Sequence, residues 1–253
     1  MEYIRLGKSN LMVSRIAMGA MNLEKIGSEA DSSGLIRQAY NSGVNFFDTA
    51  RKCQGSEKTL GDAVYDIRQN VVVATKSDSD SSGELLESVQ SSLQTLRFSY
   101  IDLFQYESNT FIPLKYGSDG LYSAMQNLKN SGVVKHLGFV TEDFDMAEKA
   151  IISGFYETIQ FPFSMISPDS VKALVKLCQE KEVGCIASQP LNGGVVNDIP
   201  LAFGFLYQFE NVVPVWGTHT QEELQQILFF NDHPPVVDKS FKEEVQKVQN
   251  FFN

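Results

Sequence analysis

The sequence predicts an α/β protein of the (β/α)₈ TIM barrel class, and three observations lead to this prediction. Eight short, continuously apolar runs have the character of parallel strands buried on both faces. Segments with helical spacing of apolar residues lie between these runs. No Gly-x-Gly-x-x-Gly turn follows the first run, which disfavours the alternative of a doubly wound open sheet. We therefore expect a single barrel domain over residues 1–253.

The strands are predicted from the apolar runs in chain order. Before them, Tyr3–Ser14, with Lys8-Ser9-Asn10 at its turn, is expected to form a short hairpin across the barrel floor. The eight barrel strands are then predicted at Arg15–Gly19, Asn45–Ala50, Val71–Lys76, Ile101–Glu107, Lys135–Val140, Thr158–Phe163, Gly184–Pro190 and Val212–Gly217.

The helices are predicted where apolar residues recur at helical spacing. One helix is expected to begin at Ser56 and Glu57, after the second strand. Pro168 and Ser170 lie near a plausible start for the helix that follows the sixth strand. The predicted ranges are Ser33–Ser42, Glu84–Leu96, Asp143–Ser153, Asp169–Glu180, Thr220–Phe230 and Ser240–Phe252.

Composition and charge disfavour several classes of protein. No run of about 18 apolar residues occurs, so no membrane span is expected. Residues 1–5 lack the pattern of a signal peptide. The net charge of −10 disfavours nucleic acid and anionic membranes as partners. The three cysteines are an odd number without metal-ligand spacing, which predicts reduced thiols in a cytoplasmic protein without a metal. The oligomeric state stays open.

Chemically active side chains end three consecutive predicted strands. Asp48, Lys76 and Glu107 hold these positions, and Cys53 lies on the loop after the second strand. In (β/α)₈ barrels the active site is built at the carboxyl ends of the strands. Asp48 is expected to keep Lys76 protonated, because burial alone would lower the pKa of the lysine. We expect Asp48, Cys53, Lys76 and Glu107 to form a catalytic site.

Segments along nearly the whole chain resemble the aldo-keto reductase family. They are Tyr3–Gly7, Val13–Ile16, Asn45–Ala50, Gly55–Glu57, Ala74–Lys76, Tyr100–Leu103, Gly132–Phe139, Gln160 and Pro190–Gly194. The latter half is most similar to the bacterial branch whose relatives often carry an iron–sulfur tail, although no such cluster is expected here. The resemblance implies NAD(P)H-dependent reduction of a carbonyl by a tetrad of Asp, Tyr, Lys and His.

Two of the four positions that correspond to the family's catalytic tetrad hold other residues in this chain. Asp48 and Lys76 match it, whereas Cys53 replaces the tyrosine and Glu107 the histidine. A thiol has a pKa of about 8.5 against about 10 for a phenol, and its thiolate is a better nucleophile or base than a proton donor. Cys53 is also shorter in reach than tyrosine. Glu107 becomes a candidate acid if burial raises its pKa.

The resemblance also implies a dinucleotide site. Val140 and Thr141 stand where the family often has the Ser-Asn pair that holds the nicotinamide carboxamide. Glu223 stands where many relatives have arginine, and Ile227 where nearly all have asparagine. A carboxylate facing a 2′-phosphate would repel it, which disfavours NADP. The implied cofactor-binding residues are Gly19, Thr141, Gln160, Ser188, Leu191, Gly193, Gly217 and Thr218.

Three functions stay open at this point. The first is a diverged NAD(P)-dependent oxidoreductase acting on a small carbonyl or alcohol. The second is a non-redox enzyme (a lyase, dehydratase or isomerase) that uses Cys53, Lys76 and Glu107. The third is a catalytically inactive binding or regulatory subunit. Trp216, the only tryptophan, directly precedes Gly217 and is expected to respond to a bound dinucleotide.

Overall fold

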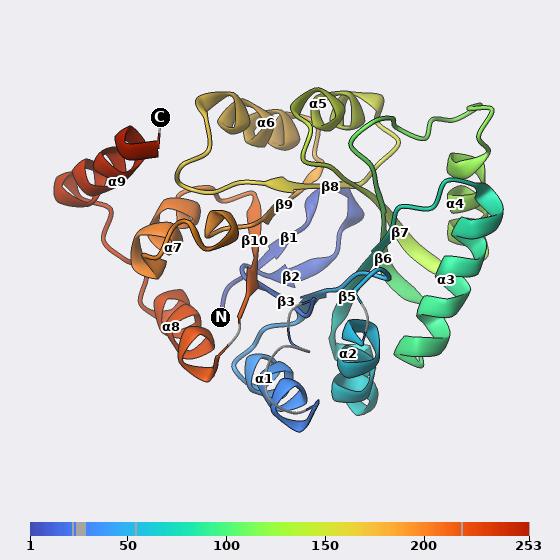
Figure 1. Ribbon diagram of the computed structural model, residues 1–253, viewed down its shortest axis with the longest axis horizontal. Coiled ribbons are helices and arrows are strands. Elements are labelled where there is room, and N and C mark those ends of the chain that lie inside the picture. The colour runs from blue at the N-terminus through green and yellow to red at the C-terminus, as the bar shows by residue number, and fades with distance from the viewer. Residues whose placement is uncertain (22, 24–28, 54, 219, 253) are drawn as a thin grey trace.

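The computed structural model describes residues 1–21, 23, 29–53, 55–218 and 220–252, and it confirms the predicted barrel. Eight parallel strands close in the order β10-β3-β4-β5-β6-β7-β8-β9, so strands that follow one another in the chain are neighbours (Figure 1). The barrel strands are β3 (Ala17–Gly19), β4 (Phe46–Asp48), β5 (Val72–Ser77), β6 (Ile101–Glu107), β7 (Val134–Val140), β8 (Thr158–Pro162), β9 (Gly184–Ser188) and β10 (Val212–Gly217).

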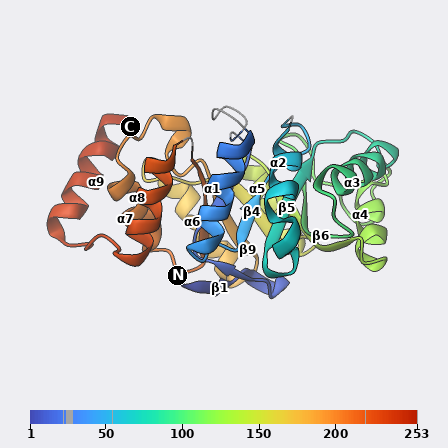
Figure 2. The same ribbon diagram turned by 90° about the horizontal axis from the view of Figure 1, so that it is seen from below.

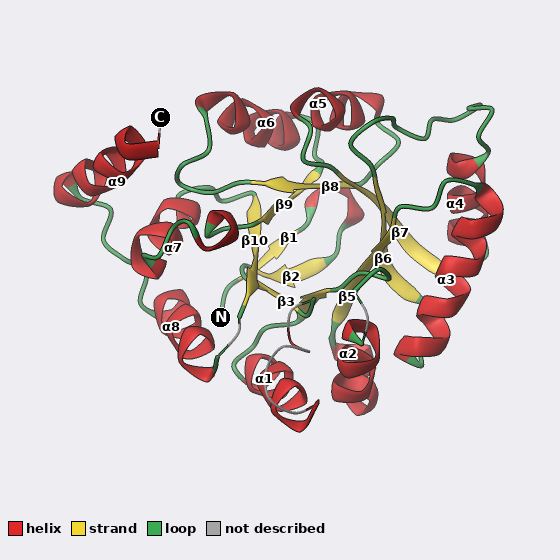
Figure 3. Cartoon of the chain, viewed as in Figure 1, coloured by secondary structure: helices red, strands yellow, loops and turns green. Residues whose placement is uncertain are grey.

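Helices surround the sheet and cover its outer face (Figure 3). Their side chains and the outward-facing strand residues form the larger of two hydrophobic clusters. This double coverage explains the continuously apolar strands. The α-helices are α1 (Glu29–Asn41), α2 (Ser56–Val64), α3 (Ser82–Leu96), α4 (Leu121–Asn130), α5 (Phe144–Ser153), α6 (Asp169–Glu180), α7 (Ile199–Tyr207), α8 (Gln221–Asp232) and α9 (Lys239–Phe252). Short 3₁₀ segments are η1 (Gly7–Ser9), η3 (Tyr65–Asn70) and η4 (Asn192–Gly194).

Two of these helices, α4 and α7, are missing from the predicted ranges. In α7 every residue from Leu201 to Leu206 is buried, so the sequence carries no alternation between a polar and an apolar face. The start of α4 follows Gly120, which has no side chain to serve as an N-cap. Among the described residues, four helices that the sequence does predict (α3, α5, α8 and α9) have side-chain caps, as when Ser81 accepts a hydrogen bond from the backbone of Glu84 in α3.

The N-terminal hairpin closes the barrel floor, as predicted. Strands β1 (Tyr3–Arg5) and β2 (Met12–Ser14) pair antiparallel. Figure 2 shows β1 at the same end of the barrel as the N-terminus. Leu6 and Val13 belong to the smaller hydrophobic cluster, which fills the barrel interior together with residues such as Phe46 and Leu103. The floor is therefore a packed apolar plug.

The interior changes from apolar to polar toward the mouth. Successive side chains in a strand point to opposite faces of the sheet, so every second residue faces inward. Phe46 and Ala74 belong to the interior cluster, and Asp48 and Lys76 follow two residues later on β4 and β5. The fold thus directs both charged side chains inward above an apolar floor. No helix among the described residues combines the length and the apolar character needed to cross a membrane.

Candidate active site

Asp48 and Lys76 form a buried ion pair at the carboxyl ends of their strands. Lys76 Nζ lies 2.7 Å from Asp48 Oδ2 and donates a second hydrogen bond of 3.0 Å to the carbonyl oxygen of Thr49. The side chain of Lys76 is 5% exposed and that of Asp48 is 0% exposed. Burial disfavours either charge alone, so each needs the other. The structure therefore brings together the two residues that match the family tetrad.

Two buried glutamines extend this pair into what we call the interior polar cluster: Asp48, Lys76, Gln105 and Gln160. Gln160 Nε2 donates a 3.1 Å hydrogen bond to Asp48 Oδ2. Gln105 Nε2 lies 3.4 Å from Asp48 Oδ1 and 2.7 Å from Gln160 Oε1. Gln105 is not among the predicted site residues, although its position two residues before Glu107 on β6 indicates the same inward face.

Gly138 of β7 leaves the space that Gln105 occupies. A Cβ at this position would lie 2.3 Å from Thr158 Oγ1 and 3.0 Å from Gln105 Cγ. Both neighbours are buried, so neither can move aside easily. The glycine is thus required here by the close approach of side chains from β6 and β8.

Hydrogen bonds anchor the loop after β4 to strand β5 and to helix α2. The backbone of Arg51 donates to the carbonyl oxygen of Lys76 over 3.0 Å, which continues the pairing with β5. Arg51 Nη1 also donates to Glu57 Oε2 at 2.9 Å, while Glu57 Oε1 accepts from Thr75 at 2.8 Å. Gly55, with φ of 79°, provides the left-handed turn into α2. These contacts fix the loop that carries Lys52 and Cys53.

The three cysteines differ in accessibility, and all carry thiols rather than disulfides. Cys53 is partly exposed at the mouth, whereas Cys178 and Cys185 are fully buried on α6 and β9. A hydrogen bond with Cys178 and burial raise the pKa of the Cys185 thiol. Of the three, Cys53 is therefore the thiol placed to meet a ligand.

Lys52 and Glu107 form a second ion pair, at the rim of the mouth. Lys52 Nζ lies 2.7 Å from Glu107 Oε1, and the side chains are 51% and 25% exposed. Burial opposes the charge of Lys52, but the hydrogen bond with Glu107 and the nearby charges of Glu107, Asp78 and Cys53 outweigh it and raise the pKa of the lysine. Glu107 Oε2 is buried without a partner among the described residues. Lys52 is not among the predicted site residues, although it adjoins Cys53 in the chain.

Several glycine residues and one unpaired hydroxyl group lie at one side of the mouth. Gly19 of β3 pairs with Gly217 of β10, and the adjacent Thr218 is 1% exposed. Thr218 Oγ1 has no hydrogen-bond partner within the described part of the chain. Leu191 precedes η4, where Gly193 has φ of 67° and open space at its Cβ position. The predicted cofactor-binding residues Gly19, Leu191, Gly193, Gly217 and Thr218 thus lie at or just after the ends of β3, β9 and β10.

On the opposite side of the mouth, two of the residues predicted to contact the cofactor already form hydrogen bonds within the protein. Gln160 is engaged within the interior polar cluster. Thr141 Oγ1 donates to Asn109 Oδ1 at 2.9 Å and accepts from the backbone of Asp143 at 3.1 Å. Ser188, at the end of β9, is partly exposed. A nicotinamide carboxamide would therefore have to compete for Gln160 and Thr141.

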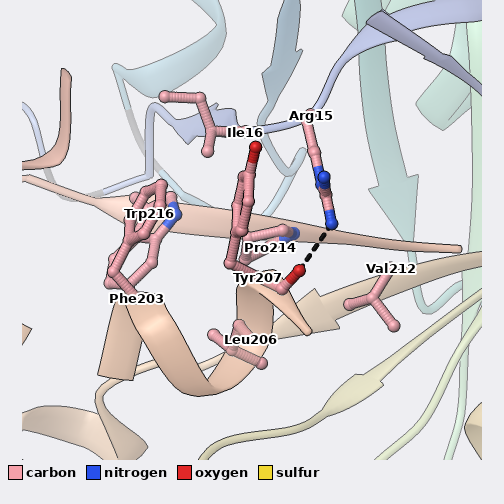
Figure 4. Close-up of a pocket in the computed structure, with 8 residues that line it drawn as sticks. All are labelled: Arg15, Ile16, Phe203, Leu206, Tyr207, Val212, Pro214 and Trp216. Carbon is pink, nitrogen blue, oxygen red and sulfur yellow. Dashed lines mark hydrogen bonds between the residues drawn. The ribbon is translucent and has the colours of Figure 1, made fainter. Parts of the chain in front are cut away.

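Trp216 points away from the mouth. Its buried ring stacks on Phe203 of α7 with ring centroids 5.8 Å apart, between the barrel and the helix layer (Figure 4). A cavity of about 10 Å³ beside it is also lined by Arg15, which donates a 2.6 Å hydrogen bond to the carbonyl oxygen of Tyr207. This volume admits no more than a water molecule. Trp216 is therefore poorly placed to report on a bound dinucleotide.

A cavity of about 500 Å³ lies beside the mouth, and its volume suits a small ligand. Its walls come mainly from α5, α6 and the end of β8, with Phe161 and Leu174 on its apolar side. None of the four predicted catalytic residues lines it. Within the described residues, no group of three or more His, Cys, Asp or Glu side chains is arranged to hold a metal ion.

The sequence comparison identifies the family of this closed (β/α)₈ barrel, which carries a buried Asp–Lys pair at its mouth. The sequence profile of the aldo/keto reductase family matches residues 15–199, from just before β3 to the first residue of α7. The chain belongs to this family, and the resemblance inferred from its motifs is confirmed.

Its relatives include proteins named as oxidoreductases. The uncharacterized oxidoreductase YqkF of Bacillus subtilis (strain 168) is 26% identical over 212 residues, which cover 78% of this chain and 67% of that protein. L-galactose dehydrogenase of Arabidopsis thaliana is 26% identical over 215 residues, with the same two coverages. The matches thus span about two thirds of these relatives' length. The family and these relatives support an oxidoreductase function.

A solved structure extends the agreement in fold to almost the entire chain. Aldo-keto reductase AKR11C1 from Bacillus halodurans, in its holo form, superposes with a TM-score of 0.85 at 20% identity. The superposition covers 98% of this chain and 96% of that chain. At this identity the likeness establishes the shared fold.

Proposed function

We propose that this protein is a nicotinamide-dinucleotide-dependent oxidoreductase that acts on a small carbonyl or alcohol. The observation that carries the proposal is the buried ion pair of Lys76 and Asp48 at the barrel mouth, in a chain of the aldo/keto reductase family. Two opposite charges held in the interior cost desolvation energy. Keeping them at the end of the barrel where active sites are built supports a catalytic rather than a structural role.

The residues around the mouth support one orientation of the cofactor. When bound, the dinucleotide supplies or accepts the hydride. Thr218 and the backbone at Gly193 would hold its phosphates, because the hydroxyl is unpaired and the glycine leaves space. Ser188 and Gln160 would face its nicotinamide end. Glu223, in the first turn of α8, would disfavour the extra phosphate of NADPH, so NADH is the proposed cofactor.

Direct titration with NADH and NADPH tests the proposal. Emission from the reduced nicotinamide itself should be followed, because Trp216 faces α7. Saturable binding of NADH supports the proposal, whereas no binding of either cofactor at millimolar concentration would refute it. Turnover should then be sought with small aldehydes and with sugars, since a relative is named L-galactose dehydrogenase.

A pair of threonine variants makes the titration specific. Thr218→Val removes a buried, unpaired hydroxyl at the proposed phosphate site, and we expect the NADH Kd to rise about 5-fold, as for the loss of one hydrogen bond. Thr158→Val is the matched control, because its hydroxyl is also buried and unpaired among the described residues but lies on β8 beside Gly138. Equal effects of the two variants on the Kd would contradict the assignment of Thr218.

One observation favours a second candidate, a non-redox enzyme. Gln160 and Thr141 already have hydrogen-bond partners, which weakens the nicotinamide end of the proposed site. Cys53 lies at the mouth, on the loop that also carries Lys52. Under this alternative, neither dinucleotide binds and Cys53 is alkylated quickly with a lowered thiol pKa. Slow alkylation with an ordinary pH dependence would exclude a thiolate mechanism.

A further inference from the structure

We propose that Lys52 is the general acid of this site, an inference that rests on the proposed function. Its ammonium would contact the carbonyl oxygen of the substrate and protonate it when hydride reaches the carbonyl carbon. The assignment begins with the place of Lys52 at the rim of the mouth, between the loop after β4 and the end of β6. Lys52 is also adjacent in the chain to Cys53, which stands where the family has its tyrosine.

The other candidates for this role are less well placed. Lys76 gives two of its three N–H groups to Asp48 and Thr49 and is almost fully buried. Lys52 is half exposed, and its described contacts occupy one N–H group, which points at Glu107. Cys53 is shorter, and a thiolate is a poor proton donor. Lys52 can therefore reach a ligand over the mouth while the Asp48–Lys76 pair stays beneath it.

Glu107 acts on Lys52 as a positioning residue. It holds the ammonium at 2.7 Å and, with Asp78 and Cys53, keeps it charged despite partial burial. These three groups come from β6, from the loop after β5 and from the loop after β4. An alkoxide formed from a carbonyl is far more basic than an amine, so an ammonium can still give it a proton.

The step balances in atoms and electrons. A bound reduced nicotinamide would supply the hydride for a new C–H bond at the carbonyl carbon, while the C=O π bond would break and its electron pair would move to oxygen. Lys52 gives one proton to that oxygen and becomes a neutral amine, which solvent reprotonates. The carbonyl is reduced to an alcohol, and the dihydronicotinamide is oxidised.

Three variants and one control test the assignment by kinetics. Lys52→Met should lower kcat by about 100-fold, which is typical for the loss of a general acid, and leave the NADH Kd within 2-fold. Lys52→Arg keeps the charge but does not release a proton near neutral pH, so its kcat should stay low. Glu107→Gln should move the alkaline limb of the kcat–pH profile to lower pH. Lys239→Met removes an exposed, paired lysine on α9 and should change nothing.

A second readout needs no turnover. Benzoate resembles a substrate in which the carbonyl oxygen carries negative charge, and calorimetry can follow its binding. We expect Lys52→Met to weaken benzoate binding about 10-fold, as for loss of a charged hydrogen bond. Lys52→Arg should bind within 3-fold of the parent chain. Glu107→Gln should tighten binding, because it removes the competing carboxylate.

The outcomes separate the two proposals. Loss of rate and of benzoate affinity in Lys52→Met, with retained NADH binding, supports the assignment. If the parent chain turns over and Lys52→Met does so at the same rate, the role of Lys52 is refuted and the proposed function stands. If Lys52→Arg restores full kcat, proton donation is refuted. If the parent chain binds no dinucleotide, the proposed function fails, and the assignment fails with it.

Discussion

Lys76 Nζ and Asp48 Oδ2 lie 2.7 Å apart inside the barrel, and neither side chain is exposed by more than 5%. Removing one partner leaves an uncompensated buried charge, so we expect Lys76→Met to lower the free energy of unfolding by about 3–5 kcal/mol. The double variant Asp48→Asn/Lys76→Met should cost less than the sum of the two single changes. Denaturant unfolding gives the free energy of unfolding of the parent chain, the two single variants and the double variant. Strict additivity would show that the two side chains are not energetically coupled.

Gly138 should tolerate no larger residue. In Gly138→Ala the new Cβ would meet Thr158 and Gln105 inside the barrel, and we expect a loss of about 1–3 kcal/mol from overpacking. Gly34→Ala is the matched control: Gly34 lies exposed in α1 with open space at its Cβ position, so this change should stabilise the protein by about 0.5–1 kcal/mol. Thermal unfolding measures how far each variant shifts the midpoint temperature from that of the parent chain. Equal shifts would contradict the close packing around Gly138.

Glu157 makes the stability of the barrel depend on pH. Burial opposes its ionisation, but hydrogen bonds from His136, Lys129 and the backbone of Leu137 outweigh burial and lower the pKa of Glu157 to about 2. A lowered folded-state pKa stabilises the native state above the unfolded value of 4.5, and this contribution is lost as pH falls from about 4.5 toward about 2.

Glu157→Gln should therefore destabilise the protein by about 1–3 kcal/mol at pH 7, and the difference from the parent chain should shrink below pH 4. Glu148→Gln, an exposed change on α5, is the control and should have little effect at either pH. The free energy of unfolding, measured by urea titration at several pH values, checks both. A difference that stays constant from pH 7 to pH 3 would rule out this linkage.

Thiol chemistry should distinguish Cys53 from the other cysteines. We expect iodoacetamide to modify one thiol in the native protein and three in denaturant, because Cys178 and Cys185 are 0% exposed. Peptide mapping should place the native adduct on Cys53. Native modification of either buried cysteine would mean that α6 opens away from β9 in solution.

The cofactor preference can be tested at α8. Glu223→Gln should raise NADPH affinity by about 5-fold with little change for NADH, since one repelling charge pair about 4 Å apart and fully hydrated contributes about 1 kcal/mol. Glu222→Gln, the exposed neighbour on the same helix, is the control. Titration of each chain with both dinucleotides gives the comparison. If Glu222→Gln has the same effect, the preference reflects overall charge and not the position of Glu223.

The sequence was sufficient to predict the barrel because each strand and most helices can be recognised within a short segment of the chain. A strand buried on both faces is apolar throughout, and a capped amphipathic helix shows its period and its cap residue. The pairing of Asp48 with Lys76 was equally accessible, since both end neighbouring strands of a barrel. α7 escaped prediction because its six consecutive buried residues, Leu201–Leu206, leave no polar face to mark the helical period.

The rest of the site depended on side-chain geometry that no sequence motif reports. That Gln105 reaches Asp48 follows from an inward face and from the space left by Gly138 on the next strand. That Lys52 meets Glu107 depends on the path of an irregular loop. Whether Gln160 is available to a ligand depends on its hydrogen bonds to neighbours far apart in the chain.

The hairpin at the barrel floor has a consequence for the order of folding. Arg5 of β1 pairs with Glu182, 177 residues later in the chain, and Gly7 packs against the backbone of Gly184. These two contacts of the hairpin therefore cannot form until β9 and the residues just before it are present. Contacts of such long sequence separation slow folding. The floor should be among the last parts of the barrel to close, and a nascent chain that stops before β9 exposes Leu6 and Val13 to aggregation.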